Sequence, residues 1–137
     1  MTHLTRWSDN DMYGHLNNAK YYELFDTTIN TWIAEHTGGD FAHKAVIGVV
    51  AESACRFHSE LSFPGYVTVG LRVQRLGNSS VVYEIGIFDG ERPDPTLTAA
   101  ATGRWVHVYI DRTAKSTVPI PEDLRGPLGE LEAQSQA

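Results

Sequence analysis

The sequence predicts an α+β domain in which an antiparallel sheet is covered by one long helix. One stretch repeats its apolar side chains with the spacing of a helical face, over about twenty residues. Other stretches alternate apolar and polar residues, as half-buried strands do. Turn signals between these stretches favour antiparallel neighbours over the long crossovers of a parallel sheet.

The helix is expected to run from about Asn18 to His36. Its apolar side chains recur at i, i+4, i+8 and i+11, a spacing that places them on one face. Asn17 is a candidate N-cap, because its side-chain oxygen can accept a backbone N–H of the first turn. Gly38-Gly39 then provides the left-handed residue that ends many helices. The face consists of Tyr21, Phe25, Ile29, Trp32 and Ile33.

The strands follow a short first strand near the N-terminus. Gly77-Asn78 and Asp89-Gly90 are turn signals, so we expect the strands to be joined by hairpin-like turns. One face of the sheet packs on the helix, and the other is either solvated or covered by a partner chain. The four stretches are Val46–Leu61, Val67–Gln74, Val82–Ile87 and Leu97–Ile110.

A single domain is expected over residues 1–118. The whole chain has 137 residues, of which 42% are hydrophobic and 20% charged, which is typical of globular proteins. Residues 119–137 differ, with three prolines, two glycines and few large apolar side chains. We expect this tail to be loosely ordered, because it can bury too little surface to offset the entropy of ordering.

The charge and cysteine content exclude several classes of function. With 11 Lys and Arg against 17 Asp and Glu the net charge is −6, which argues against nucleic acid as a partner. The single cysteine, Cys55, excludes an internal disulfide and a cysteine-based zinc site. No apolar run reaches the roughly 18 residues that span a bilayer, and the N-terminus lacks the apolar stretch of a secretory signal. We expect a cytoplasmic protein with no membrane partner and no metal.

Residues that can carry chemistry gather just before the helix, in the stretch R-W-S-D-N-D-M-Y-G-H-L-N-N-A-K-Y-Y at residues 6–22. Asp9 and Asp11 precede a helix N-terminus, whose free N–H groups and positive dipole end favour negative charge. A thioester carbonyl held there would have its developing oxyanion stabilised. A neighbouring carboxylate could attack the carbonyl or activate water. The alternative is that these Asp and Asn residues are only caps and turn formers.

The same stretch resembles the signature of the 4-hydroxybenzoyl-CoA thioesterase family of hotdog-fold acyl-CoA thioesterases. The pattern D-x-D-x-x-G-H-x-N-N-x-x-Y is met at each fixed position from Asp9 to Tyr21. A second, weaker match covers residues 57–84, and the whole resemblance extends from residue 1 to about 112. It implies a hotdog fold, with the antiparallel sheet wrapped around one long central helix. It also implies homodimers or homotetramers with active sites between protomers.

The resemblance implies an enzyme that hydrolyses an acyl-CoA thioester to a carboxylate and free CoA, with no cofactor. Asp11 matches the family's catalytic carboxylate, which acts as nucleophile or general base. Asn18 matches the helix-start position whose backbone N–H polarises the carbonyl. His15 and Asn17 match positions that shape the pocket. The family often has an acidic residue after its Phe-Pro pair, and Gly65-Tyr66 stands there instead, which puts local substrate contacts in doubt.

Arg75, Ser79 and Ser80 flank the turn at Gly77-Asn78 and are candidates for binding the CoA part of the substrate. The resemblance implies that basic and hydroxyl groups at strand ends hold the CoA phosphates, and arginine suits phosphate through paired hydrogen bonds. The alternative is an ordinary solvated hairpin with polar residues.

Other functions stay open. The same pocket could hold an acyl-CoA without hydrolysing it, as a hotdog binding module. An enoyl-CoA hydratase of the same fold is less favoured. Such hydratases usually carry an Asp/His pair in a longer helical segment, and this sequence lacks that pattern. A triad of His58, Ser59 and Glu60 is disfavoured, since neighbours on one extended strand cannot converge. Glu23 lies on the predicted helix, where another hotdog branch has its catalytic glutamate, but the Asp11 match makes that role unnecessary.

Overall fold

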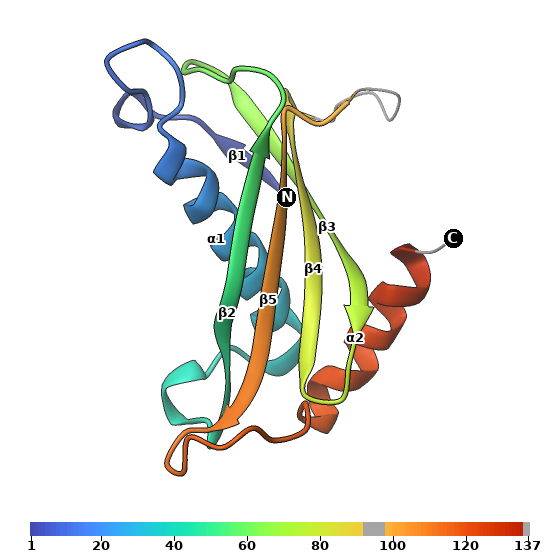
Figure 1. Ribbon diagram of the computed structural model, residues 1–137. Helices are drawn as coiled ribbons and strands as arrows, with labels where there is room; N and C mark the ends of the chain where they lie inside the picture. Colours follow the sequence, from blue (N-terminus) through green and yellow to red (C-terminus); the bar gives the residue numbers. More distant parts are fainter. Residues whose placement is uncertain (92–97, 136–137) are drawn as a thin grey trace.

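The structure is a computed structural model that describes residues 1–91 and 98–135. A five-stranded sheet curls around one long helix, and a second, C-terminal helix lies beside the sheet (Figure 1). The α+β architecture predicted from the sequence is therefore confirmed. In chain order the elements are β1 (Thr2–Leu4), α1 (Asn18–Thr37), β2 (Val46–Phe57), β3 (Tyr66–Leu76), β4 (Ser80–Asp89), β5 (Ala101–Asp111) and α2 (Glu122–Ser135), with single 3₁₀ turns at Trp7–Asp9 and Phe41–His43.

Helix α1 begins and ends where its capping residues predict. The side chain of Asn17 accepts a hydrogen bond from the backbone N–H of Ala19 at 2.9 Å. Gly38 closes the helix in the left-handed region, at φ 84°, and its N–H donates to the carbonyl of Ala34. The face that carries Tyr21, Phe25 and Ile29 is buried against the sheet.

The sheet has the order β1-β3-β4-β5-β2, with every neighbouring pair antiparallel. Strands β3 and β4 form the predicted hairpin around Gly77-Asn78. The expected hairpin-like turn between β2 and β3 is wrong, because β2 pairs with β5 at the opposite edge, from Val46↔Asp111 to Phe57↔Ala101. Leu97, the predicted start of the last strand, lies outside the described residues.

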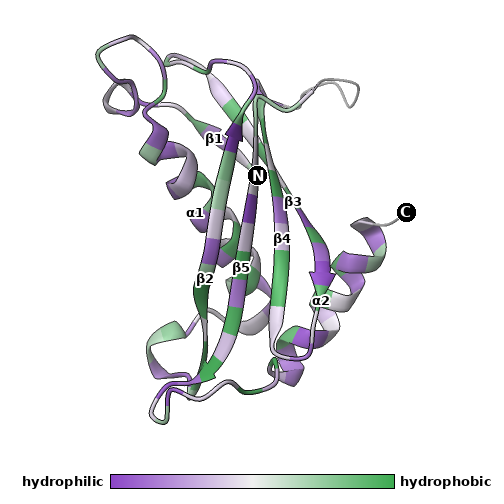
Figure 2. Ribbon diagram, in the orientation of Figure 1, coloured by the Kyte–Doolittle hydropathy of each residue, from purple (hydrophilic) through white to green (hydrophobic). Residues whose placement is uncertain are grey.

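Strand β2 ends four residues earlier than expected, because the chain then turns inward beneath the start of α1. Leu61 is buried there, and its carbonyl accepts the backbone N–H of Leu16 at 2.7 Å. Hydrophobic and hydrophilic residues alternate along the strands, so one face is apolar and packs on α1 (Figure 2). Segment 58–65 thus brings the end of β2 against the loop that precedes α1.

The C-terminal segment differs from the loosely ordered tail expected over residues 119–137. It forms α2, which buries Leu124 and Leu128. Strand β1 pairs with only the first residues of β3, which leaves further N–H groups on that edge without strand partners. Helix α2 supplies acceptors for them: the Ser135 hydroxyl for Val73 N–H at 3.1 Å and the Glu132 carboxylate for Leu76 N–H at 3.0 Å. Covering an open strand edge stabilises this helix despite its proline.

Candidate active site

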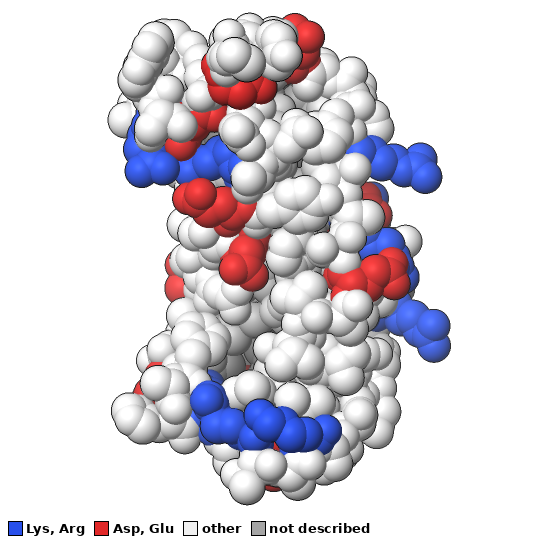
Figure 3. Space-filling view, turned by 60° about the vertical axis from the view of Figure 1, so that its left-hand side comes forward, with Lys and Arg blue, Asp and Glu red and all other residues white. Residues whose placement is uncertain are grey.

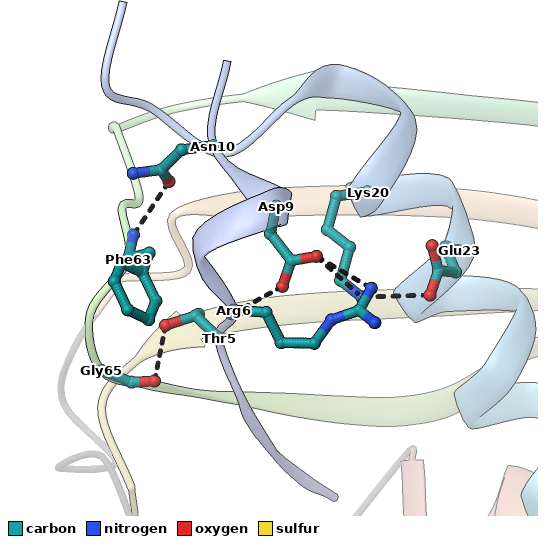
Figure 4. Close-up of polar contacts among 8 residues, drawn as sticks. All are labelled: Thr5, Arg6, Asp9, Asn10, Lys20, Glu23, Phe63 and Gly65. Atoms are coloured by element: carbon teal, nitrogen blue, oxygen red, sulfur yellow. Dashed lines mark hydrogen bonds and ion pairs between the residues drawn. The ribbon is translucent and has the colours of Figure 1, made fainter. Parts of the chain in front are cut away.

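The loop before α1 is fastened to the segment that follows β2. The Thr5 hydroxyl donates to the carbonyl of Gly65 at 2.7 Å, and the Asn10 side chain accepts the N–H of Phe63 at 2.9 Å (Figure 4). These contacts join residues more than fifty positions apart in the sequence. The loop is therefore held by side-chain contacts to this segment's backbone, one just before the motif and one within it.

Asp9, the first acid of the motif, is buried and serves to position the loop. Its side chain is 3% exposed and accepts hydrogen bonds from the Arg6 backbone N–H at 2.8 Å and the Arg6 guanidinium at 3.1 Å. Lys20 Nζ lies 3.5 Å from the same carboxylate (Figure 4). Burial alone would raise the pKa of Asp9, but the bonds from Arg6 and the charge of Lys20 outweigh it and lower that pKa. The Asp9 carbonyl also accepts the N–H of Asn17, which orients the start of α1.

We expect Asp9→Asn to lower the free energy of unfolding by about 1–3 kcal/mol, because the amide cannot replace the charge that pairs with Arg6 and Lys20. The lowered pKa means that the carboxylate stabilises the folded state above about pH 4. This contribution disappears as the pH falls through the folded pKa. Thermal unfolding of both proteins from pH 3 to pH 7 checks this, and a gap between them that stays constant over that range would contradict it.

Asp11, the second acid, has a different environment. It is partly exposed, and one oxygen, Oδ1, accepts the backbone N–H groups of Tyr13 at 2.9 Å and His15 at 3.3 Å. Gly14 makes this tight turn possible with its φ of 82°. The other oxygen, Oδ2, has no hydrogen-bond partner within residues 1–91 and 98–135. The carboxylate is thus held in place through one oxygen, while the other is unpaired in the described structure.

The first turn of α1 leaves one donor available. The N–H of Ala19 is taken by the Asn17 side chain, and that of Lys20 by the Asn17 carbonyl. The N–H of Asn18 has no acceptor in the described part of the chain, and no acidic side chain lies in this turn. A free N–H at the positive end of a helix dipole is suited to an anionic oxygen.

A histidine and a third carboxylate, after Asp9 and Asp11, also lie at this end of the molecule. His15 Nε2 lies 3.1 Å from a carboxylate oxygen of Glu60, in the segment after β2. Burial raises the pKa of the Tyr21 hydroxyl, and the neighbouring acidic groups of Asp11 and Glu60 raise it further, so it stays protonated. The pairing of His15 with Glu60 was not expected, because only the return of the chain at Leu61 brings them together.

The structure brings together four of the residues predicted for the site: Asp11, His15, Asn17 and Asn18. The other three, Arg75, Ser79 and Ser80, lie at the opposite end of the sheet. Ser79 sits beside the end of β5, where its carbonyl accepts the N–H of Tyr109, and α2 binds the turn through Arg125. At about 3.3 Å per residue, β3 alone separates the two groups by about 30 Å. One chain therefore does not place these three side chains beside Asp11.

The disfavoured triad of His58, Ser59 and Glu60 does not form. His58 faces Thr102, with Nε2 3.0 Å from its hydroxyl, while Glu60 faces His15. Burial raises the pKa of the Cys55 thiol to about 11, so it is not a thiolate at neutral pH. Across the described residues, no group of three or more His, Cys, Asp or Glu side chains is placed to hold a metal ion.

A family model described as the thioesterase-like superfamily matches residues 5–128. The chain belongs to this superfamily. The membership confirms the predicted hotdog fold and the predicted class of enzyme, a thioester hydrolase. The narrower 4-hydroxybenzoyl-CoA thioesterase family stays a prediction.

Solved structures of similar fold agree with this membership. The PA5185 protein from Pseudomonas aeruginosa strain PAO1 is 44% identical, with a TM-score of 0.87 over 96% of this chain and 89% of the other. The PA2801 protein from the same species is 28% identical, with a TM-score of 0.83 over 93% and 95%. BH1999 gentisyl-coenzyme A thioesterase is 19% identical, with a TM-score of 0.78 over 93% and 98%, and shares the fold. No curated protein matches.

Neither helix of this thioesterase-like chain is long and apolar enough to cross a membrane, as far as the described residues extend.

Proposed function

We propose that this member of the thioesterase-like superfamily is an acyl-CoA thioesterase that releases a carboxylate and free CoA. The observation that carries the proposal is the hydrogen bonding of the Asp11 carboxylate. One of its oxygens accepts two backbone N–H groups, and the other is unpaired in the described structure. The helix that follows this loop begins with the free N–H of Asn18. Gentisyl-coenzyme A thioesterase, which shares the fold, supports a CoA ester as the substrate class.

In this proposal the thioester carbonyl oxygen lies at the N-terminus of α1 and accepts the Asn18 N–H. As a nucleophile, Asp11 Oδ2 would form a bond to the carbonyl carbon, and the C–S bond would then break to release the CoA thiolate. Water would hydrolyse the resulting anhydride. As a general base, Asp11 would instead take a proton from the water that attacks the carbonyl, and the C–S bond would then break to release the CoA thiolate. In both routes negative charge develops on the carbonyl oxygen, where the helix dipole and the Asn18 N–H stabilise it.

We propose that Arg75, Ser79 and Ser80 take part only in a homo-oligomer, in which another protomer brings them to the substrate. Strand β2 supports such an assembly, because it is twelve residues long and lies at an edge of the sheet. Long open edges are normally paired or covered. The number of protomers and the cytoplasmic location stay predictions.

The test is the release of free thiol from a panel of CoA esters with short, branched, long and aromatic acyl groups. Appearance of CoA with the wild-type protein supports hydrolysis, and the preferred acyl group gives the substrate class. If a folded protein binds CoA esters but releases no thiol from any of them, the chain is a binding module and the proposal fails. Loss of ester without free thiol would indicate a hydratase.

The pair of His15 and Glu60 offers a rival general base, which a single substitution separates from Asp11. We expect Glu60→Gln to change kcat by no more than about fivefold, because the Glu60 side chain is largely exposed, that of His15 is partly exposed, and water screens their attraction. A loss of 10² or more, the size of a general-base effect, would transfer the base role to His15. Initial rates at saturating substrate decide between these results.

A further inference from the structure

A cavity of about 620 Å³ lies at the end of the sheet away from Asp11. It opens between the C-terminal half of α1, the start of β2, the end of β5 and the segment that leads into α2 (Figure 1). Apolar side chains provide much of its lining, including Ile33, Val46, Val118 and Leu124. The volume lies within the range of small-molecule sites in proteins.

His107 gives this cavity a polar group without a partner. The residue is 3% exposed, lies on β5 and lines the cavity. Its Nδ1 is enclosed and has no hydrogen-bond partner, and its Nε2 makes no hydrogen bond in the described part of the chain either. Burial lowers the pKa of His107 to about 4, so the ring is neutral at pH 7 and has one N–H to donate. The enclosed Nδ1 is out of reach of a ligand, whereas Nε2 is not enclosed and can donate to an acceptor in the cavity when it carries the proton.

Positive charge lies beside the same cavity. Lys44 and Arg112 line it, against a single acidic residue, Asp123. The Arg112 guanidinium is already committed to the carbonyls of Lys44 and Phe41, at 2.8 and 2.6 Å. Lys44 Nζ has only the carbonyl of Thr37, at 3.4 Å, and no carboxylate within ion-pair distance in residues 1–91 and 98–135.

The space-filling view agrees with this charge distribution. Positively charged side chains gather at the lower end of the face in Figure 3, beside a hollow. Negative side chains are spread mainly over the middle and upper parts of that face. The chain carries a net charge of −6, so a local excess of positive charge is a feature of this end rather than of the whole surface.

We infer that this cavity binds an organic acid group, meaning an alkyl or aryl body with a carboxylate or acyl carbonyl at one end. The apolar walls receive the body. His107 donates its Nε2–H to the oxygen end, and Lys44 adds the charge that favours an anion. Cation, donor and apolar walls come from separate segments of the chain and converge on one space.

This chemistry can come from two sources. A free acid could bind here at a site separate from Asp11, which lies about 30 Å away at about 3.3 Å per residue along β2. Alternatively, the acyl group of a substrate that reacts at Asp11 of another protomer could enter the cavity. The second source rests on the proposed thioesterase function, and the first does not.

Calorimetric titration with sodium decanoate tests the site in the full chain. We expect one decanoate to bind per chain and Lys44→Met to weaken it at least tenfold. Lys115→Met, a matched loss of charge at an exposed lysine outside the cavity, should leave affinity unchanged. Decylamine, with the same alkyl body and the opposite charge, should bind at least tenfold more weakly to the wild type. This comparison needs no variant and stands even if a substitution unfolds the protein.

His107→Phe keeps the ring volume and removes both nitrogens. We expect it to weaken decanoate about tenfold while raising the melting temperature, since an unpartnered buried imidazole is removed. A purely structural histidine would change the melting temperature and leave decanoate binding unchanged, which would overturn its role. The site itself is overturned if decanoate does not bind at millimolar concentration, if Lys44→Met and Lys115→Met bind alike, or if decylamine binds as well as decanoate.

Thiol release from butyryl-CoA and decanoyl-CoA distinguishes the two sources. If Lys44→Met lowers kcat/KM for decanoyl-CoA more than for butyryl-CoA, the cavity holds the acyl group of the substrate. If that ratio is unchanged while decanoate binding is lost, the cavity is a separate acid site. If the wild type releases no thiol at all, the proposed function fails, and the titration still decides the cavity.

Discussion

Replacing Asp11 by asparagine is expected to lower kcat for thioester hydrolysis by about 10²–10⁴, the range of general-base effects. The amide is nearly the same size and can still accept the N–H groups of Tyr13 and His15, so the loop should keep its conformation. It is neither a nucleophile nor a base at neutral pH. We expect kcat and kcat/KM to fall together, since the lost interaction acts in the transition state.

Two controls make this result interpretable. Asp40→Asn changes an exposed aspartate beyond the C-terminal end of α1 in the same way and should keep wild-type rates. Circular dichroism and size-exclusion chromatography of Asp11→Asn should match the wild type, because the carboxylate makes no ion pair in the described structure. Full activity in a folded Asp11→Asn protein would remove this residue from the mechanism and leave His15 as the next candidate.

Sequence patterns predicted the helices and strands whose stability depends on residues close together in the chain. Helix α1 was expected at Asn18–His36 and lies at Asn18–Thr37, because the caps at Asn17 and Gly38 act within one turn. The strands were predicted from the alternation of apolar and polar side chains, because this alternation indicates which face of a strand is buried, as in β4 and β5. The two acids of the motif were placed together, but their separate environments depend on Arg6 and Lys20, which lie close to Asp9 and not to Asp11 in the fold.

The features that the sequence did not predict all depend on contacts between distant segments. The place of β2 beside β5 is set by strand pairing, which period-two alternation does not specify. Helix α2 was missed because three prolines outweighed the leucines at positions 124, 128 and 131, whose i, i+4, i+7 spacing was the available signal. The partner of His15 lies 45 residues away, and the cavity around His107 is assembled from four separate segments.

Gly103→Ala is expected to lower the free energy of unfolding by about 1–3 kcal/mol or more, although it adds a single methyl group. Gly103 lies in β5 directly beneath α1, where an added Cβ would stand 2.6 Å from Cε2 of Phe25 and under 3.0 Å from two further ring atoms. Phe25 is fully buried and contacts the rings of Tyr22 and Trp105, at centroid distances of 6.2 and 6.3 Å. The ring therefore has no space into which it can retreat. Urea unfolding at pH 7 measures the loss.

The matched control is Gly70→Ala, in the middle of β3. An added Cβ there meets only Phe88, at 3.8 Å, so we expect stability to be unchanged or slightly higher. If Gly103→Ala and Gly70→Ala behave alike, the contact with Phe25 is not what requires glycine at 103. A double variant, Phe25→Leu with Gly103→Ala, should lose less than the sum of the two single changes, because the smaller side chain relieves the clash.

The same substitution connects the core to the proposed chemistry. Phe25 and Asn18 belong to one helix, so a methyl group that pushes Phe25 away from the sheet also moves the N-terminus of α1. A displacement of about 1 Å at a reacting centre can cost about 10² in rate. We therefore expect Gly103→Ala to lower kcat at temperatures where it is still folded, and Phe25→Leu in the same chain to restore part of it. Reduced stability with an unchanged kcat would show that the helix N-terminus is positioned by the Asp9 network rather than by the packing beneath it.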